Sequence, residues 1–183
     1  MTRKCRDLAK NLGYPCLHVS DVCHGFPGPR SSLGFAGQMI GVPCAAVEIG
    51  GLGFGQEQEE AWVQENVRCI RNAMMYAGML EGTPELPGRY LVMHSRWRVA
   101  PSRAGYLEPL VGLDRQFTEV KKGEALARLI DPYTLEEVEV LRSPGRGVIF
   151  YACRPYMIRP GQWAFGVGNL DDGKTGWYAR DAI

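Results

Sequence analysis

The spacing of apolar residues predicts alternating helices and strands in the first part of the chain. In order, the expected elements are a helix over residues 3–12, a short strand over 15–19, a helix from Ser31 or Ser32 to about Ile40, a strand over Cys44–Ile49 and a helix over Gln58–Ala77. This order is typical of an α/β layer with parallel strands, but two strands are too few for an independent sheet. We therefore expect further strands of this layer to lie upstream.

The longest of these helices is predicted from a regular apolar stripe. Its apolar residues recur at steps of four and three: Val63, Val67, Ile70, Met74 and Ala77. Gly78 and Gly82 are expected to end it.

Beyond a linker at residues 83–88, the pattern changes to short strands separated by turns, with no helical period to residue 183. Residues 105–126 align with residues 147–164 if the first copy carries a four-residue insertion. Two such copies facing each other would make a small barrel-like sandwich. We thus predict two domains, residues 1–88 and 89–183.

The amino-acid composition limits the kinds of molecule that the protein is expected to bind and the cellular compartment in which it is expected to lie. The 183 residues are 45% hydrophobic, and 21 basic against 20 acidic side chains give a net charge of +1, which offers no electrostatic basis for binding nucleic acid or an anionic membrane. No apolar stretch reaches the roughly 20 residues of a membrane span. The six cysteines include no CxxC pair, which favours reduced thiols. We expect a soluble cytoplasmic protein that binds a small molecule.

Glu48 is the strongest candidate for chemistry. It lies near the end of the otherwise apolar strand predicted over Cys44–Ile49, where a carboxylate is costly unless it is used or paired. At the carboxyl end of a parallel strand it would face the crevice in which α/β enzymes place their sites. The alternative is a structural carboxylate that pairs with Arg30 or Arg71.

Several segments match one family in order. They are GVPCAAVEIGG at residues 41–51, Tyr76–Leu80, AGYLEPLV at 104–111, VKKGEALARLIDP at 120–132 and SPGRGVIF at 143–150. They are distributed between residues 41 and 150, and on them the chain resembles the C-terminal half of the succinylglutamate desuccinylase/aspartoacylase family of zinc-dependent deacylases. The resemblance implies an α/β remnant of a zinc-carboxypeptidase-like domain followed by an all-β barrel-sandwich domain.

The resemblance also implies a reaction and roles for residues. The family hydrolyses the amide bond of an N-acyl amino acid or related N-acyl amine. Glu48 would be its catalytic general base, and Gly50 and Gly51 would belong to a substrate-binding loop. The cofactor would be zinc, held by an HxxE pair and a later histidine in the half that precedes Met1, so no metal ligand is expected in this chain. Possible partners are that zinc-binding half or a second copy of the chain.

The histidines present do not replace those ligands. His18 is followed three residues later by Asp21, and neither His24 nor His94 has an acidic residue at that spacing. Zinc lowers the pKa of water from about 16 to about 7, roughly 12 kcal/mol, whereas a general base alone contributes about 10²- to 10⁴-fold. The isolated chain is therefore predicted to be inactive. The alternative is a non-catalytic binding or assembly module.

Three other patterns in the sequence bear on alternative functions. Cys16, His18, Cys23 and His24 place four potential zinc ligands close together, but their spacing fits no usual structural zinc site. The glycine-rich loop at residues 50–55 matches neither phosphate-binding motif, GxGxxG or GxxxxGK[ST]. A biotinyl or lipoyl carrier needs a lysine on the hairpin between the half-barrels, where residues 131–137 have none, and Lys121 and Lys122 lie earlier.

Overall fold

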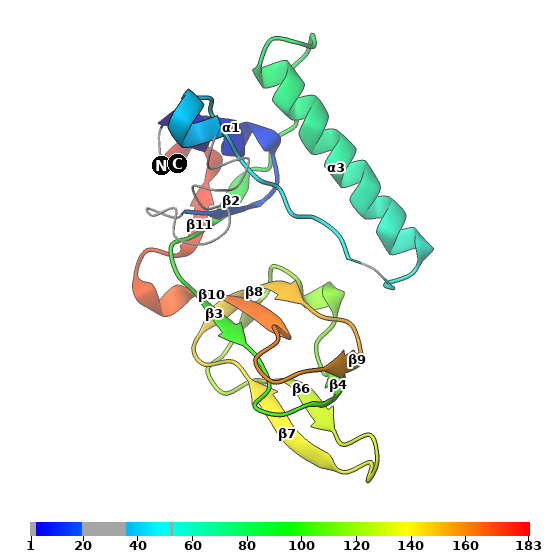
Figure 1. Cartoon of the computed structure of the whole chain (residues 1–183). Coiled ribbons are helices and arrows are strands. Elements are labelled where there is room, and N and C mark those ends of the chain that lie inside the picture. The colour runs from blue at the N-terminus through cyan, green and yellow to red at the C-terminus, as the bar shows by residue number, and fades with distance from the viewer. Residues whose placement is uncertain (1–2, 20–35, 52) are drawn as a thin grey trace. The chain divides into compact units, whose positions relative to one another are not determined.

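The computed structural model describes residues 3–19, 36–51 and 53–183. The chain forms two compact units, one of Met1–Val92 together with Trp177–Ile183, the other of Met93–Gly176 (Figure 1). The sequence predicts a single boundary after residue 88, whereas in the structure the C-terminal strand returns to the first unit. It does so because it pairs with a strand far away in the sequence, which a local pattern cannot reveal.

The first unit combines helices with one three-stranded sheet of order β1-β2-β11. Its elements are α1 (Arg3–Leu12), β1 (Cys16–His18), a π-helical turn (Ala36–Ile40), α3 (Gln56–Tyr76), β2 (Arg89–Met93), β11 (Gly176–Ala179) and a 3₁₀ turn (Arg180–Ala182). Helix α1 contacts α3, and the Tyr90 hydroxyl on β2 donates to the Lys10 carbonyl of α1 over 2.8 Å. These contacts join α1 both to the sheet and to α3.

Most of the predicted elements of this unit are confirmed. Helix α1 has the predicted bounds and ends at Gly13, whose φ of 80° is unfavourable for any residue with a side chain. Strand β1 lies within the predicted 15–19, and α3 agrees with the predicted helix to within two residues. Of the helix predicted from Ser31 or Ser32 to Ile40, the structure describes only the π-helical turn.

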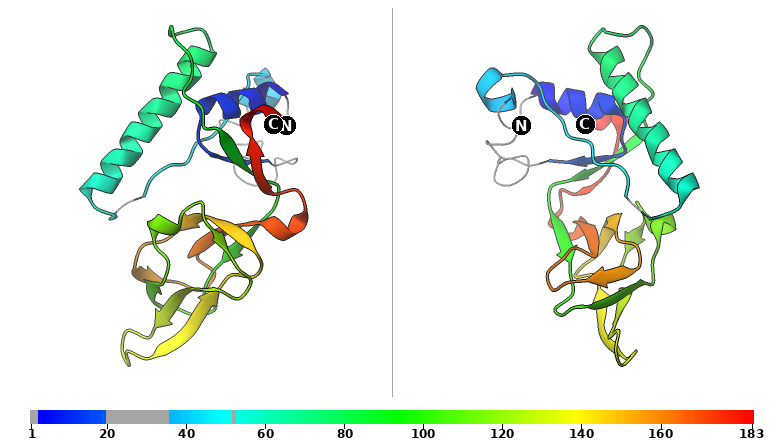
Figure 2. Two further views of the ribbon diagram at one scale, coloured as in Figure 1. Left: turned by 180° about the vertical axis from the view of Figure 1, so that it is seen from behind. Right: turned by 45° about the vertical axis from the view of Figure 1, so that its right-hand side comes forward.

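The strand predicted over Cys44–Ile49 is wrong. This segment is a coil (Figure 2). None of its residues is fully buried, and Glu48 is exposed. A strand must pair its backbone N–H and C=O groups with a neighbouring strand. None of the three sheets in the described residues includes this segment as a strand. The Cys44 N–H donates instead to the Cys5 thiol over 3.5 Å. The apolar sequence is suited to a buried strand, but the neighbour that would pair with it is not among the described strands.

The second unit consists of two four-stranded antiparallel sheets, ordered β3-β10-β8-β5 and β7-β6-β4-β9. The strands are β3 (Arg96–Val99), β4 (Gly105–Pro109), β5 (Glu119–Val120), β6 (Ala125–Ile130), β7 (Glu137–Arg142), β8 (Gly147–Ala152), β9 (Tyr156–Ile158) and β10 (Phe165–Asn169). Two 3₁₀ turns, Leu113–Arg115 and Leu170–Asp172, complete the unit.

The predicted repeat appears in the strand order. The first copy supplies β4, β5 and β6, and the second supplies β8, β9 and β10. Strand β4 pairs with β6 of its own copy and with β9 of the other, and β8 pairs in the same way with β10 and β5. The aligned turn glycines also agree, since Gly123 and Gly161 have φ values of 79° and 71°. Each copy thus adds its short strand to the sheet of the other.

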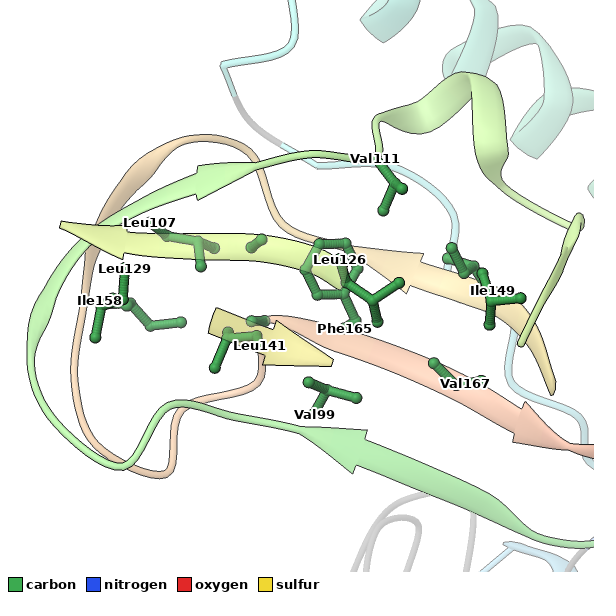
Figure 3. Packing of buried hydrophobic residues seen from close by; sticks show 13 residues of the cluster. Val99, Leu107, Val111, Leu126, Leu129, Leu141, Ile149, Ile158, Phe165 and Val167 are labelled. Carbon is green, nitrogen blue, oxygen red and sulfur yellow. The ribbon is translucent and has the colours of Figure 1, made fainter. Parts of the chain in front are cut away.

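One hydrophobic core lies between the two sheets and takes at least one side chain from each of their eight strands (Figure 3). Leu107, Leu129, Ile149 and Phe165 are completely buried in it. Each such side chain contributes about 1.5–3 kcal/mol relative to an exposed one. The core explains why this segment forms a compact unit.

Candidate functional site

Glu48 lies in the coil that leads into α3, with its side chain exposed. Among the described residues it forms no ion pair, and Arg71, one of the two arginines considered as structural partners, is not bonded to it. The other, Arg30, lies outside the described residues. The Glu48 carboxylate is therefore accessible to a solvent molecule or a substrate.

The glycine-rich loop that follows Glu48 turns sharply at three positions. Gly50, Gly53 and Gly55 have φ values of 115°, 78° and 100°, which only glycine adopts readily. Gly51 instead lacks space, because a Cβ there would lie 2.8 Å from the ring of Phe54. The predicted loop residues Gly50 and Gly51 thus lie two and three residues after Glu48, and no side chain of their own covers their backbone.

Two polar side chains of α3 hold this loop. The Glu59 carboxylate accepts hydrogen bonds from the N–H groups of Gly53, at 2.9 Å, and Phe54, at 3.2 Å. The Asn66 amide donates to the carbonyls of Trp62, at 2.7 Å, and Ile49, at 3.5 Å. Asn66 therefore fixes the residue next to Glu48, and Glu59 fixes the far side of the loop.

Aromatic packing completes the anchor. The rings of Phe54 and Trp62 meet edge to face with their centroids 5.2 Å apart, and a Cβ at Gly50 would lie 3.8 Å from the Trp62 side chain. The roles of Glu59, Trp62 and Asn66 were not predicted from the sequence. The available signal was an acidic residue in the first turn of a helix that follows a glycine-rich loop, which is typical of a side chain that accepts from N-terminal backbone N–H groups.

The same contacts argue against a phosphate-binding loop. Such a loop offers backbone N–H groups to an anion. Here the N–H groups of Gly53 and Phe54 already donate to Glu59, and Glu57 and Glu60 add further negative charge to the start of α3. An anion would have to displace a carboxylate.

The described residues do not fit a zinc ion. They contain no group of three or more histidine, cysteine, aspartate or glutamate side chains that could hold a metal. Of the cluster considered above, Cys16 and His18 lie on β1, while Cys23 and His24 lie outside the described ranges. Any zinc at Glu48 would need ligands from beyond the residues that the structure describes.

The turn at which a biotinyl or lipoyl carrier would have its lysine contains none. The turn between β6 and β7 is held by Asp131, whose carboxylate accepts from the N–H groups of Tyr133 and Thr134 at 2.8 and 3.2 Å. Lys121 and Lys122 lie on the turn between β5 and β6 instead, within one copy of the repeat.

Comparison with solved structures identifies the fold. The chain is similar to the ectoine utilization protein EutE (DoeB) of Ruegeria pomeroyi, with a TM-score of 0.71, 21% identity, and coverage of 91% of this chain and 49% of that one. It is also similar to a succinylglutamate desuccinylase/aspartoacylase of Rhodobacter sphaeroides, with a TM-score of 0.69, 21% identity, and coverage of 90% and 48%. The chain has the fold of part of each of these proteins.

A further neighbour agrees, an aspartoacylase family protein of Mesorhizobium loti with a TM-score of 0.68, 15% identity, and coverage of 90% of this chain and 46% of that one. The predicted resemblance is thus confirmed for the fold, and the chain spans about half the length of these deacylase-fold proteins. No protein-family model and no curated protein matches the sequence. Among the described residues, no helix has the length and apolar character needed to cross a membrane.

Proposed function

We propose that this chain forms part of a zinc-dependent deacylase that hydrolyses the amide bond of an N-acyl amino acid or a related N-acyl amine. The supporting observation is the structural similarity over nine-tenths of the chain to desuccinylase and aspartoacylase proteins. Under this proposal the second unit is the barrel-sandwich domain expected from the duplicated pattern. The cysteine usage favours a cytoplasmic location.

Glu48 is the proposed general base. Amide hydrolysis requires that a water molecule lose a proton as its oxygen bonds to the carbonyl carbon, and that the amine nitrogen gain a proton as the C–N bond breaks. A single carboxylate can accept the first proton and deliver the second, so that the products are a carboxylic acid and an amine. The exposed side chain of Glu48, on a segment fixed by Asn66, is suited to this transfer.

Gly50 and Gly51 are the proposed substrate-binding part of the loop. Because they carry no side chains, the backbone here offers N–H and C=O groups to a substrate at close range. The edge-to-face pair of Phe54 and Trp62 and the carboxylate of Glu59 hold the loop in place. Such preorganisation lowers the entropy lost on binding.

Zinc enters this proposal by resemblance alone, because the described residues supply no ligand set for it. The ligands would belong to a zinc-binding half supplied from beyond these residues, and the 183-residue chain by itself would have little activity. A general base without the metal contributes only about 10²- to 10⁴-fold.

The test is to add the portion of the R. pomeroyi protein that this chain does not match, with zinc, and to measure hydrolysis of N-acyl amino acids. We expect activity only in the combined sample. Glu48→Gln keeps the shape but removes the base, so kcat should fall at least about 10²-fold with the metal content unchanged.

The matched control is Glu57→Gln, an exposed carboxylate on the first turn of α3, which should leave kcat within about twofold if its only effect is on surface charge. Full activity of the Glu48→Gln sample would return Glu48 to a structural role.

The second candidate is a non-catalytic binding or assembly module with the same fold. The observation that favours it is the lack of a metal-ligand cluster among the described residues. The two candidates differ in one outcome, since a binding module would take up an N-acyl amino acid, seen by calorimetry, without turnover in the combined sample.

A further inference from the structure

Helix α3 turns its apolar face away from the rest of its unit. The stripe residues Val63, Val67 and Ile70 are 51%, 44% and 59% exposed, respectively. On the other side of the helix, Cys69 and Asn72 are only 2% and 1% exposed. A helix of a globular protein normally buries its apolar stripe and exposes its polar face. The orientation of α3 is the reverse.

Specific hydrogen bonds fix this orientation. The Asn72 amide donates to the carbonyls of Leu12, at 3.1 Å, and Glu85, at 2.9 Å, and its oxygen accepts from the Glu85 N–H at 2.9 Å. The Arg68 guanidinium donates to the carbonyls of Glu85 and Gly13 at 2.8 and 3.1 Å. Rotation of α3 to bury its stripe would break all of these bonds. The stripe is therefore a lasting surface of the unit.

A second apolar feature lies immediately before α3. The segment Cys44–Ile49 carries Val47 and Ile49, residues suited to a strand, yet it is a coil with no strand partner among the described residues. The glycine-rich loop and the bond from Asn66 to the Ile49 carbonyl link it to the helix. Figure 2 shows this segment, in cyan, as a coil that leads toward α3.

Segment and helix have the order of one strand–loop–helix unit of a parallel sheet. In such a unit the strand pairs along an edge, and the following helix covers a face of the same sheet. A second copy of the chain could cover the stripe with its own α3, but it could offer residues 44–49 only their own counterpart as a strand partner, and an isolated two-stranded pair is marginally stable in water. A parallel sheet satisfies both features at once.

We propose that the apolar stripe of α3 and residues 44–49 form one docking surface for a parallel β-sheet of a complementary α/β half. Residues 44–49 add to the edge of that sheet as a strand, and Val63, Val67 and Ile70 pack on its face. The similar solved structures contain about as much chain again as this one covers, which is enough for a half that supplies such a sheet. The inference rests on the proposed function and names the surface through which the zinc-binding half attaches.

The test joins the unmatched portion of the R. pomeroyi protein to Met1 of the whole 183-residue chain through a flexible glycine-serine linker. A short linker gives an effective concentration in the millimolar range, so that even a weak interaction is populated. Hydrogen exchange reports on the backbone of residues 44–49, and hydroxyl-radical footprinting reports on the stripe side chains.

In the fusion we expect exchange of residues 44–49 to slow at least about tenfold and labelling of Val63 and Ile70 to fall, relative to the unfused chain. Val67→Glu should reverse both effects. The matched control is Ala61→Glu, which adds the same carboxylate at an exposed position on the opposite side of α3. Both positions are exposed in the chain alone, so circular dichroism of the unfused variants should be unchanged.

Two outcomes would overturn the proposal. One is a fusion in which both segments behave as in the unfused chain. The other is protection of the stripe in the unfused chain that grows with its concentration while residues 44–49 still exchange, because that result assigns the stripe to a second copy. Neither readout depends on hydrolysis. A fusion that docks but does not hydrolyse an N-acyl amino acid would contradict the proposed function and leave the docking surface standing.

Discussion

Glu59 has a structural role at the proposed site, because its carboxylate holds the glycine-rich loop and takes no part in the proposed reaction. It accepts from two consecutive backbone N–H groups, of Gly53 and Phe54, and so ties the glycine-rich loop to the first turn of α3. Hydrogen bonds to a charged acceptor contribute about 1.5–3 kcal/mol each, less where solvent reaches them. The loop after Glu48 is ordered by these bonds and not by its own sequence, which is rich in glycine.

We predict that Glu59→Ala loosens the loop without unfolding α3. Hydrogen exchange at Gly53 and Phe54 should accelerate at least about tenfold, because both N–H groups lose their acceptor. Glu57→Ala, two residues earlier and without a bond to the loop, is the control and should leave exchange there unchanged. Equal acceleration in both variants would mean that general charge at the helix start, not this pair of bonds, orders the loop.

Asp172 has a comparable role in the second unit. Its carboxylate accepts from the hydroxyls of Ser95, at 2.6 Å, and Thr175, at 2.7 Å, and from the N–H groups of Lys174 and Thr175 at 2.8 and 2.6 Å. Partial burial acts to raise the pKa of Asp172, but these hydrogen bonds outweigh it and hold the pKa well below the ordinary value. The cluster ties the residues that enter the unit to those that leave it.

The second unit should therefore lose stability in acid. A folded-state pKa below the unfolded value gives stabilisation that is present above about pH 4 and declines as the pH falls toward the folded pKa. Asp172→Asn should remove this part of the pH dependence and lower stability at neutral pH. Urea denaturation at pH 7 and pH 3 measures it, with Asp114→Asn, an exposed position, as the control. An unchanged difference between the two pH values in Asp172→Asn would contradict the assignment.

At the scale of elements, both copies of the repeat have a glycine at the start of an equivalent strand, where the paired strand approaches closely. Gly105 and Gly147 begin β4 and β8, which are equivalent in the two copies. A Cβ at Gly147 would lie 2.4 Å from the Gly168 carbonyl of the paired strand, and one at Gly105 would lie 2.9 Å from the Ile130 carbonyl. Both obstacles are backbone carbonyl oxygens, which cannot move aside as a flexible side chain can. The backbone therefore excludes larger residues at both strand starts.

We predict that Gly147→Ala lowers the free energy of unfolding of the second unit by about 1–3 kcal/mol, as expected for overpacking. Urea denaturation followed by hydrogen exchange of β8 peptides gives the value for this unit. Gly88→Ala is the control, because a Cβ there meets no heavy atom within 4 Å. If Gly147→Ala were as stable as the wild type, the close approach of β8 and β10 would not require glycine.

At the scale of the whole molecule, the two units differ in how complete their packing is. The second encloses a core supplied by all of its strands, whereas the first exposes the stripe of α3 and a coil suited to a strand. Polar groups in the described residues are nonetheless satisfied, since no buried side-chain nitrogen or oxygen lacks a hydrogen-bond partner. The first unit is thus well bonded but has an apolar surface suited to a further partner.

The lack of a metal-ligand cluster among the described residues of both units predicts the zinc content of the purified chain. We predict that the purified 183-residue chain retains no stoichiometric zinc after dialysis, because its described residues provide no ligand cluster. Elemental analysis by mass spectrometry is the measurement, and the sample combined with the zinc-binding portion is the positive control. About one zinc retained per chain would direct attention to Cys16, His18, Cys23 and His24, and substitution of Cys23 would then show whether that cluster holds it.

The sequence by itself determined what depends on neighbours along the chain. Helical periods set α1 and α3, glycine ended α1, and the repeated pattern after residue 105 predicted the duplicated set of strands in the second unit. The resemblance carried by motifs such as residues 41–51 also predicted the fold, which the chain shares with solved structures at 21% identity.

Only the tertiary structure decided what depends on distant partners. The pairing of β11 with β2 places the C-terminus in the first unit, and the lack of a paired strand leaves Cys44–Ile49 a coil despite its apolar sequence. The hydrogen bonds of Asn72 turn the stripe of α3 outward, although the stripe itself was read correctly from its spacing. A pattern states which face is apolar, but only the available partners determine whether that face becomes buried, since burial and pairing are properties of two surfaces and not of one.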